Sequence, residues 1–171
     1  MKRRDFIKTT AAGIGGLSVM GARGQGATGA KKPLRIALIG CGDRGGRQLI
    51  VECCKEQVVA LADPDPARIA FTLQQVRKTL PSADTGAIKT FSDYRKLFDV
   101  MGKDLDAVFI ATPNHQHAIP ALMAIRRGLH VYVEKPLTHT IQEARLLREE
   151  AKRHGVVTQL GNHGHSNEEC R

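Results

Sequence analysis

The sequence has no tryptophan, few aromatic residues and few cysteines. Five Phe, two Tyr and four Cys occur among its 171 residues, and no two cysteines form a C-x-x-C pair. The neighbours Cys53 and Cys54 would diverge on any helix, which argues against a disulfide framework and against a zinc ribbon. We therefore expect buried or half-buried thiols.

Acidic residues are in the minority, so the formal net charge is +9. Four of these positive charges fall within residues 1–29, and the rest are scattered without a basic stripe or interleaved aromatic residues. A nucleic-acid surface would concentrate its charge in such a stripe. The pattern indicates an ordinary solvated basic surface, and we expect no nucleic acid as a partner.

The first 30 residues resemble a twin-arginine export signal. The letters RRDFIK at residues 3–8 fit the pattern R-R-x-F-[IL]-K, and a Gly/Ala-rich segment, Thr9 to Ala22, follows. This segment is too short and too weakly apolar to span a bilayer stably, and small residues up to Ala30 offer cleavage points. A disordered basic tail is the alternative. The motif predicts a partner in the twin-arginine machinery and a periplasmic or other extracytoplasmic location, so we exclude residues 1–30 from the fold.

A glycine-rich loop, GCGDRGG, directly follows the apolar run Leu34 to Ile39 and precedes a helical pattern. Its G-x-G-x-x-G spacing permits a tight turn, approach of the backbone to a pyrophosphate, and close packing of helix on strand. The helix behind it would aim its N–H groups and dipole at the phosphates. The loop therefore predicts cofactor contacts from Gly40, Gly42, Asp43, Arg44 and Gly45.

A second apolar run, Val58 to Ala62, ends in Asp63, which lies 23 residues after Gly40. This spacing is close to the roughly 20 residues expected for a carboxylate that binds ribose hydroxyls. Its negative charge would repel a 2′-phosphate, which favours NAD over NADP as the cofactor. A plain turn aspartate is the alternative interpretation.

Strand and helix patterns alternate along the rest of the chain. Four further strands are expected at Ala87–Phe91, Asp106–Thr112, His130–Val133 and Val156–Leu160. Five helices are expected at residues 44–55, 66–80, 94–101, 115–127 and 140–154, with N-caps at Asp65, Ser92, Asn114 and Thr140. Two β-α-β-α-β halves predict an α/β fold over residues 31–161: a doubly wound, mostly parallel sheet in the order 3-2-1-4-5-6.

Two segments at expected strand ends, ATPNHQH at residues 111–117 and HVYVEKP at 130–136, resemble the Gfo/Idh/MocA oxidoreductases, the group of glucose–fructose oxidoreductase and inositol dehydrogenase. The likeness runs from Lys32 to about Arg171. It implies a Rossmann NAD-binding domain followed by a larger α/β substrate domain, through which homo-oligomers often form. Because the sequence stops soon after the sixth expected strand, we expect a fragment or truncated chain in which residues 162–171 begin the second domain.

The resemblance also implies roles for individual residues. Lys135 would be the catalytic lysine beside the nicotinamide and the substrate hydroxyl, where partial desolvation would let it exchange a proton with a sugar hydroxyl. Glu134 would orient this lysine or contact the cofactor, and Asn162 would reach the nicotinamide amide. A solvated ion pair at a strand end is the alternative for the Glu-Lys pair. The remaining cofactor contacts would be Thr112, Pro113, Asn114 and His117.

Histidines form two H-x-H pairs, at residues 115 and 117 and at residues 163 and 165. A metal is conceivable there, but residues two apart diverge at a helix start, so we expect none. The expected function is an exported NAD-dependent oxidoreductase of a sugar, polyol or related carbohydrate. The alternatives are an NAD-dependent glycosidase of the same superfamily, or a nucleotide-binding domain without turnover.

Overall fold

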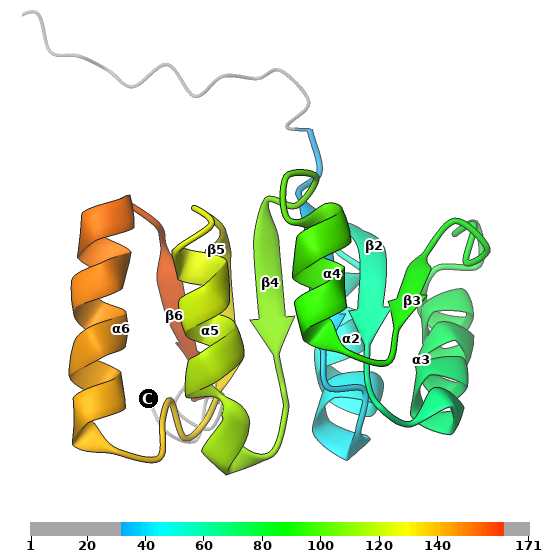
Figure 1. The fold of residues 1–171 in the computed structure, drawn as a ribbon. Helices are drawn as coiled ribbons and strands as arrows, with labels where there is room; N and C mark the ends of the chain where they lie inside the picture. Colours follow the sequence, from blue (N-terminus) through cyan, green and yellow to red (C-terminus); the bar gives the residue numbers. More distant parts are fainter. Residues whose placement is uncertain (1–31, 163–171) are drawn as a thin grey trace, which may run out of the picture. The chain divides into compact units, whose positions relative to one another are not determined.

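A computed structural model describes residues 32–162 (Figure 1). The predicted export signal and most of the segment expected to begin a second domain therefore lie outside the described residues. The strands are β1 (Arg35–Ile39), β2 (Gln57–Ala62), β3 (Lys89–Phe91), β4 (Ala107–Ile110), β5 (His130–Glu134) and β6 (Thr158–Gly161). The helices are η1 (Asp43–Leu49), α2 (Ile50–Cys53), α3 (Pro66–Thr79), α4 (Tyr94–Met101), η2 (Asn114–Gln116), α5 (Ala118–Ile125) and α6 (Ile141–His154).

The six strands form one parallel sheet in the order β3-β2-β1-β4-β5-β6, which confirms the predicted topology. Side chains of β1 alternate between its two faces. Ala37 and Ile39 join a core with α4, α5 and α6, whereas Ile36 and Leu38 join a core with η1, α2 and α3. Because helices cover β1 on both faces, an uninterrupted apolar strand is the expected pattern there.

The pairing of β1 with β2 contains one irregularity. Ile36 pairs with Val58, but Ala37 pairs with Ala60, so Val59 of β2 has no counterpart on β1. Beyond this bulge the register brings Ala62 opposite Ile39, and the N–H of Gly40 donates to the carbonyl of Ala62 at 2.8 Å. The ends of the two strands are therefore level.

Several predicted helix ends are confirmed. Asp65 caps α3 with Pro66 at the first helical position, and the Thr140–Glu143 capping box opens α6. Gly155, with a φ of 63°, ends α6 in the left-handed conformation that glycine adopts without a steric cost.

Two predicted caps are wrong. The carboxylate of Asp93, not the hydroxyl of Ser92, accepts the N–H of Arg95 at the start of α4. Asn114 lies inside the short 3₁₀ helix η2, and no side chain caps that helix or α5. Its neighbour Pro113, with a φ of −55° and a ψ of 143°, leads the chain into this tighter turn, so the α-helix begins only at residue 118.

The helix after the glycine loop also differs from the expectation of a regular α-helix. Its first seven residues, η1, form a π-helix, and only α2 is α-helical. Gly45 and Gly46 lie within η1, and a Cβ on Gly46 would meet the carbonyl oxygen of Cys41 at 2.6 Å. Two adjacent glycines have little preference for the α-helix and allow this wider turn close to β1.

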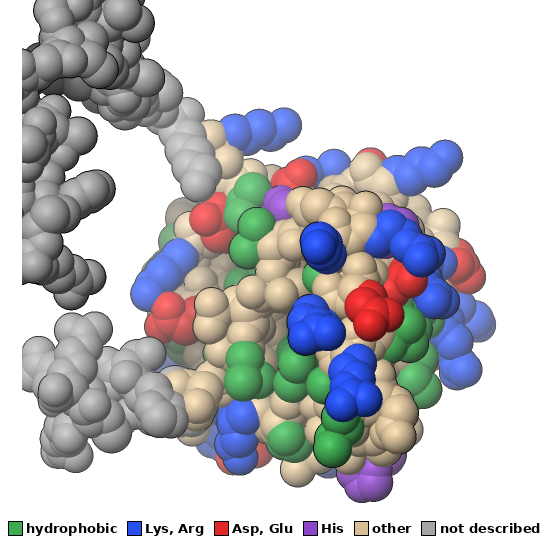
Figure 2. Space-filling view, turned by 90° about the vertical axis from the view of Figure 1, so that its left-hand side faces the viewer, with side chains coloured by type: hydrophobic (Ala, Val, Ile, Leu, Met, Phe, Trp, Pro, Cys, Tyr) green, Lys and Arg blue, Asp and Glu red, His purple; other side chains and the backbone are tan. Residues whose placement is uncertain are grey.

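The described cysteines behave as expected: Cys41 and Cys53 are buried, and Cys54 is half-buried. On the face of the molecule on the α6 side, Lys and Arg side chains lie among acidic, apolar and uncharged ones (Figure 2). Buried Glu150 of α6 pairs with Arg126 of α5 at 3.1 Å. None of the helices among residues 32–162 is long and apolar enough to span a membrane.

Candidate cofactor site

A cavity of about 540 Å³ opens at the carboxyl ends of β1, β2 and β4, within the size range of small-molecule sites. Parallel α/β sheets bind their ligands at this edge. Among the predicted contact residues, those that line this cavity are Gly40, Gly42, Asp63, Thr112 and Pro113.

The three glycines of the loop have different neighbours. Gly40 has a φ of +92°, and a Cβ there would lie 2.5 Å from the carbonyl oxygen of Ala111. A Cβ on Gly45 would run into the carbonyl oxygen of Gly40. On Gly42, by contrast, the nearest atom to a Cβ would be Nη1 of Arg68 at 3.5 Å. Gly40 and Gly45 are therefore required by packing, whereas Gly42 keeps the cavity open.

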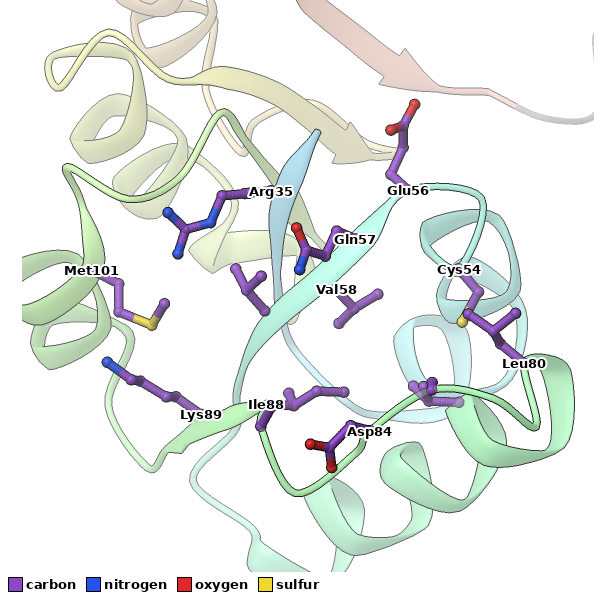
Figure 3. A pocket seen from close by; sticks show the side chains of 14 residues that line it. Arg35, Cys54, Glu56, Gln57, Val58, Leu80, Asp84, Ile88, Lys89 and Met101 are labelled. Atoms are coloured by element: carbon purple, nitrogen blue, oxygen red, sulfur yellow. The ribbon is translucent and has the colours of Figure 1, made fainter. Parts of the chain in front are cut away.

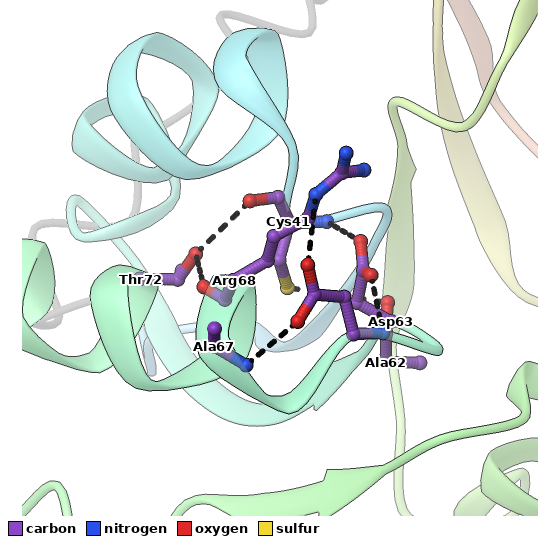
Figure 4. Close-up of polar contacts among 7 residues, drawn as sticks. Cys41, Ala62, Asp63, Ala67, Arg68 and Thr72 are labelled. Atoms are coloured by element: carbon purple, nitrogen blue, oxygen red, sulfur yellow. Dashed lines mark hydrogen bonds and ion pairs between the residues drawn. The ribbon is translucent and has the colours of Figure 1, made fainter.

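The carboxylate of Asp63 is buried and held by two backbone groups (Figure 4). One oxygen accepts the N–H of Cys41 at 2.8 Å, and the other accepts the N–H of Asp65 at 2.9 Å. Asp63 thus stabilises its own turn and also lines the cavity, so the two sequence interpretations do not exclude each other. Each carboxylate oxygen retains acceptor capacity for a ribose hydroxyl.

The loop between β3 and α4 and the start of α4 also line the cavity, which the sequence interpretation missed. Ser92 and Asp93 of the loop and Tyr94 and Arg95 of α4 contribute, together with Arg68 of α3. Arg95 pairs with Asp93 at 2.9 Å, and Arg68 pairs with Asp65 at 3.4 Å. This loop follows the third strand of a parallel sheet, so the rule that placed Asp63 at the site would have found it too.

Thr112 supplies an independent indication of a ligand. Its Oγ1 is the buried side-chain polar atom, among residues 32–162, that has no hydrogen-bond partner. Buried hydroxyls in native structures nearly always have a partner, and one that lacks it needs an explanation. An open glycine and a fixed carboxylate on one cavity, with Thr112 beside them, fit the phosphate and ribose groups of a dinucleotide.

Arg44 and Glu134, both predicted to contact the cofactor, contact each other. Nε of Arg44 lies 2.8 Å from Oε1 of Glu134, whose side chain is 4% exposed. Tyr132 donates its hydroxyl to the same oxygen at 3.3 Å, and burial together with this carboxylate raises the pKa of Tyr132. Arg44 also hydrogen-bonds Gln48. This ion pair joins the glycine loop to the Glu-Lys-Pro turn.

Lys135 itself is exposed, so the described residues alone do not give it the partial desolvation that we expected. Asn162 lies with Arg44 along a separate hollow on the sheet, where the rings of Phe109 and Tyr132 stack at 5.2 Å. Asp43 is exposed and pairs with Arg47. These residues lie outside the cavity that holds Asp63.

His117 does not line the cavity either, because its side chain is buried at 1% exposure. Its Nδ1 lies 2.6 Å from the carbonyl oxygen of Pro136, and its Nε2 lies 2.8 Å from that of Thr112. Asn114 and His115 are exposed on η2. The first H-x-H pair therefore diverges, and the second lies outside the described residues.

A further cavity, of about 420 Å³, lies at the opposite edge of the sheet (Figure 3). The first residues of three strands, Arg35, Gln57 and Lys89, contribute to its lining together with apolar side chains. None of the predicted contact residues lies there, and the amino ends of parallel strands are not where such sheets bind cofactors. The cavity at the carboxyl ends remains the candidate site.

Comparison with known proteins agrees with this geometry. The family model described as "Oxidoreductase family, NAD-binding Rossmann fold" (GFO_IDH_MocA) matches residues 34–162. The chain is 30% identical over 131 residues to the scyllo-inositol 2-dehydrogenase (NAD(+)) of Bacillus subtilis, which covers 75% of this chain and 35% of that enzyme. It is 33% identical over 148 residues to a glycosyl hydrolase family 109 protein of Stenotrophomonas maltophilia. That match covers 84% of this chain and 31% of the relative.

Among solved structures, an NAD binding oxidoreductase from Klebsiella pneumoniae superposes with a TM-score of 0.61 at 31% sequence identity, covering 79% of this chain and 36% of that one. The chain spans about a third of the length of the curated relatives named above. The matched region contains the whole described sheet, and the family description confirms NAD as the cofactor. The chain belongs to the Gfo/Idh/MocA oxidoreductase family, of which it contains the NAD-binding Rossmann domain.

Proposed function

We propose that this chain is the cofactor domain of an exported oxidoreductase that transfers hydride between NAD and a hydroxyl-bearing carbon of a sugar, polyol or related carbohydrate. The observation that carries the proposal is the convergence of Gly42, Asp63 and Thr112 on one cavity at the carboxyl ends of the strands. Gly42 would face the pyrophosphate, and Asp63 would accept hydrogen bonds from ribose hydroxyls. Bound NAD would supply the hydride acceptor.

Lys135 is the residue to which we assign the proton transfer. It directly follows strand β5 and is exposed, so a substrate can approach its side chain. A lysine accepts a proton only as its neutral amine and donates one as its ammonium, so Lys135 would take up the hydroxyl proton as the amine when the hydride leaves the carbon, and return it as the ammonium in the reverse direction. The carbohydrate class of substrate is supported by the relative named as an inositol dehydrogenase.

Isothermal titration calorimetry of the chain with NAD⁺ and NADP⁺ tests the cofactor part of the proposal. We expect NAD⁺ to bind more tightly, and Asp63→Asn to weaken NAD⁺ binding, because asparagine has no charge and keeps only one of the two oxygens that accept backbone N–H groups and ribose hydroxyls. Reduction of NAD⁺ in the presence of inositols and sugars then tests turnover. Binding without turnover would favour a nucleotide-binding domain that is inactive in isolation.

Export is proposed from the RRDFIK motif alone. Since no free NAD pool is expected outside the cytoplasm, the cofactor should be tightly held and recycled within the site. Replacement of both Arg3 and Arg4 by lysine should keep the full chain in the cytoplasmic fraction, whereas the unchanged chain should reach the periplasm. Equal distribution of the two forms would refute export by this route.

An NAD-dependent glycosidase is a second candidate, supported by the glycosyl hydrolase family 109 relative. The Glu134-Lys135-Pro136 motif, from which we expect the catalytic lysine, is the feature that leads us to prefer the dehydrogenase. Release of nitrophenol from nitrophenyl glycosides, only when NAD is present, would identify the glycosidase.

A further inference from the structure

His117 connects the two loops that carry the family's characteristic segments. Its ring is buried between the carbonyl of Thr112, at the end of β4, and the carbonyl of Pro136, directly after Lys135. The two contacts lie 5 and 19 residues away along the chain, in opposite directions.

Each contact joins a ring nitrogen of His117 to a backbone carbonyl oxygen, so its character depends on whether that nitrogen carries a proton. A carbonyl oxygen can only accept a hydrogen bond, whereas a neutral imidazole has one N–H and one unprotonated nitrogen. Both contacts are hydrogen bonds only when both ring nitrogens carry a proton. The ring nitrogens lie 2.6 and 2.8 Å from the two carbonyl oxygens, so the ring fills the space between the two turns and bonds at least one of them.

We propose that His117 is a positioning residue, which holds the Lys135–Pro136 turn against the end of β4 and so fixes where Lys135 stands relative to the cofactor cavity. This inference rests on the proposed function, since it gives Lys135 a place beside the nicotinamide. It also replaces the role predicted from the sequence, because a side chain that is 1% exposed and in contact with a carbonyl oxygen at each nitrogen acts on the cofactor only through these backbone groups.

The first test is a spectroscopic signature of the full chain and needs no cofactor. In nitrogen-15 NMR spectra of protein labelled at the histidine rings, a His117 ring proton that bonds a backbone carbonyl should exchange slowly with water. The exposed His115 on the same short helix should exchange its ring protons rapidly. Rapid exchange of every His117 ring proton would overturn the proposal.

The second test separates positioning from general stability. In His117→Gln the side-chain amide lies where Nε2 lies and can still reach Thr112, but the bond to Pro136 is lost. We expect NAD⁺ to bind about tenfold more weakly, as for the loss of one buried hydrogen bond, and ADP-ribose, which has no nicotinamide, to bind within about twofold of the unchanged chain. His117→Asn, whose amide lies where Nδ1 lies, should keep most of the NAD⁺ affinity, and His115→Asn should keep all of it.

A merely structural histidine would give a different result. Equal weakening of NAD⁺ and ADP-ribose in a folded His117→Gln variant, or no weakening of either, would overturn the proposal. If Gln does not fold at this site, His117→Asn, which keeps the contact with Pro136, should retain most of the NAD⁺ affinity, and a loss of tenfold or more in this folded variant relative to His115→Asn would overturn the proposal. If the unchanged chain binds no NAD⁺, the proposed function fails. The ring-nitrogen spectra still decide whether His117 bonds the backbone turns.

Discussion

Replacing each of two glycines in the loop by alanine should separate folding from cofactor binding. In Gly45→Ala the new methyl group meets the carbonyl oxygen of Gly40, and it lies 3.3 Å from Cβ of Ala111. Gly40 cannot move away without breaking its 2.8 Å hydrogen bond to Ala62. Overpacking against side chains costs about 1–3 kcal/mol, and against fixed backbone we expect at least about 3 kcal/mol of unfolding free energy.

Gly42→Ala is the matched variant, only three residues away. The backbone of Gly42, with a φ of −66° and a ψ of −166°, is accessible to alanine, and the methyl group would meet only Arg68 at 3.5 Å. The unfolding free energy should stay the same or rise by about 0.4–1 kcal/mol, because alanine restricts the unfolded chain. The methyl group would project into the space for the pyrophosphate, so the affinity for NAD⁺ should fall about tenfold or more.

Urea unfolding followed by circular dichroism measures the first quantity, and calorimetric titration with NAD⁺ measures the second. For a domain of this size, the loss in Gly45→Ala corresponds to a fall in melting temperature of about 10 °C. Two results would refute the reasoning: a Gly45→Ala chain as stable as the original, or a Gly42→Ala chain that binds NAD⁺ with unchanged affinity. The second would also mean that the pyrophosphate does not approach this loop.

Three further predictions concern charged groups and a thiol. Arg44→Met leaves the buried Glu134 without its cation, so urea unfolding should show a loss of about 2 kcal/mol, and a loss near zero would contradict the pairing. The hydrogen bond from Arg126 holds the pKa of Glu150 below its ordinary value of 4.5, so the stability that this pair contributes is present above that pH and is lost as the pH falls through the lowered value. Unfolding free energies measured across this range should therefore fall less steeply for Glu150→Gln, and parallel curves would contradict the prediction. Burial raises the pKa of the Cys41 thiol to about 12, so iodoacetamide should not alkylate it in the native chain at mildly alkaline pH, and rapid alkylation detected by mass spectrometry would be the contrary result.

The topology could be predicted from the sequence because its causes are local. Apolar runs with helical patterns between them, right-handed crossovers and a glycine loop leave few arrangements open, and the observed strand order is the predicted one. The capping box at Thr140 and Glu143 involves residues three apart, and it too was predictable. Ser92 and Asp93 were harder to separate, because both side chains are good caps and only the backbone decides which one is in place.

The candidate site could be predicted only in part. The position of Asp63 follows from its place after a strand, but the pairing of Arg44 with Glu134 spans 90 residues and depends on how two loops meet. The same holds for His117, whose sequence neighbours give no indication that two carbonyl oxygens flank its ring. Contacts of this kind depend on the three-dimensional approach of loops, which residue spacing does not determine.

The bulge at Val59 has a consequence for how such sites should be recognised among distant proteins. One residue of β2 adds to the count between Gly40 and Asp63 without adding to the length of the ladder, since Ala60 and not Val59 pairs with Ala37. A chain that lacked the bulge would bring its carboxylate to the same place with one residue fewer. An insertion or deletion at this point is therefore neutral for the site if the bulge absorbs it, and disruptive if the register beyond Ala60 shifts. Alignments of this region should therefore superpose the carboxyl ends of β1 and β2, and should allow the number of residues between the first glycine and the carboxylate to vary by one.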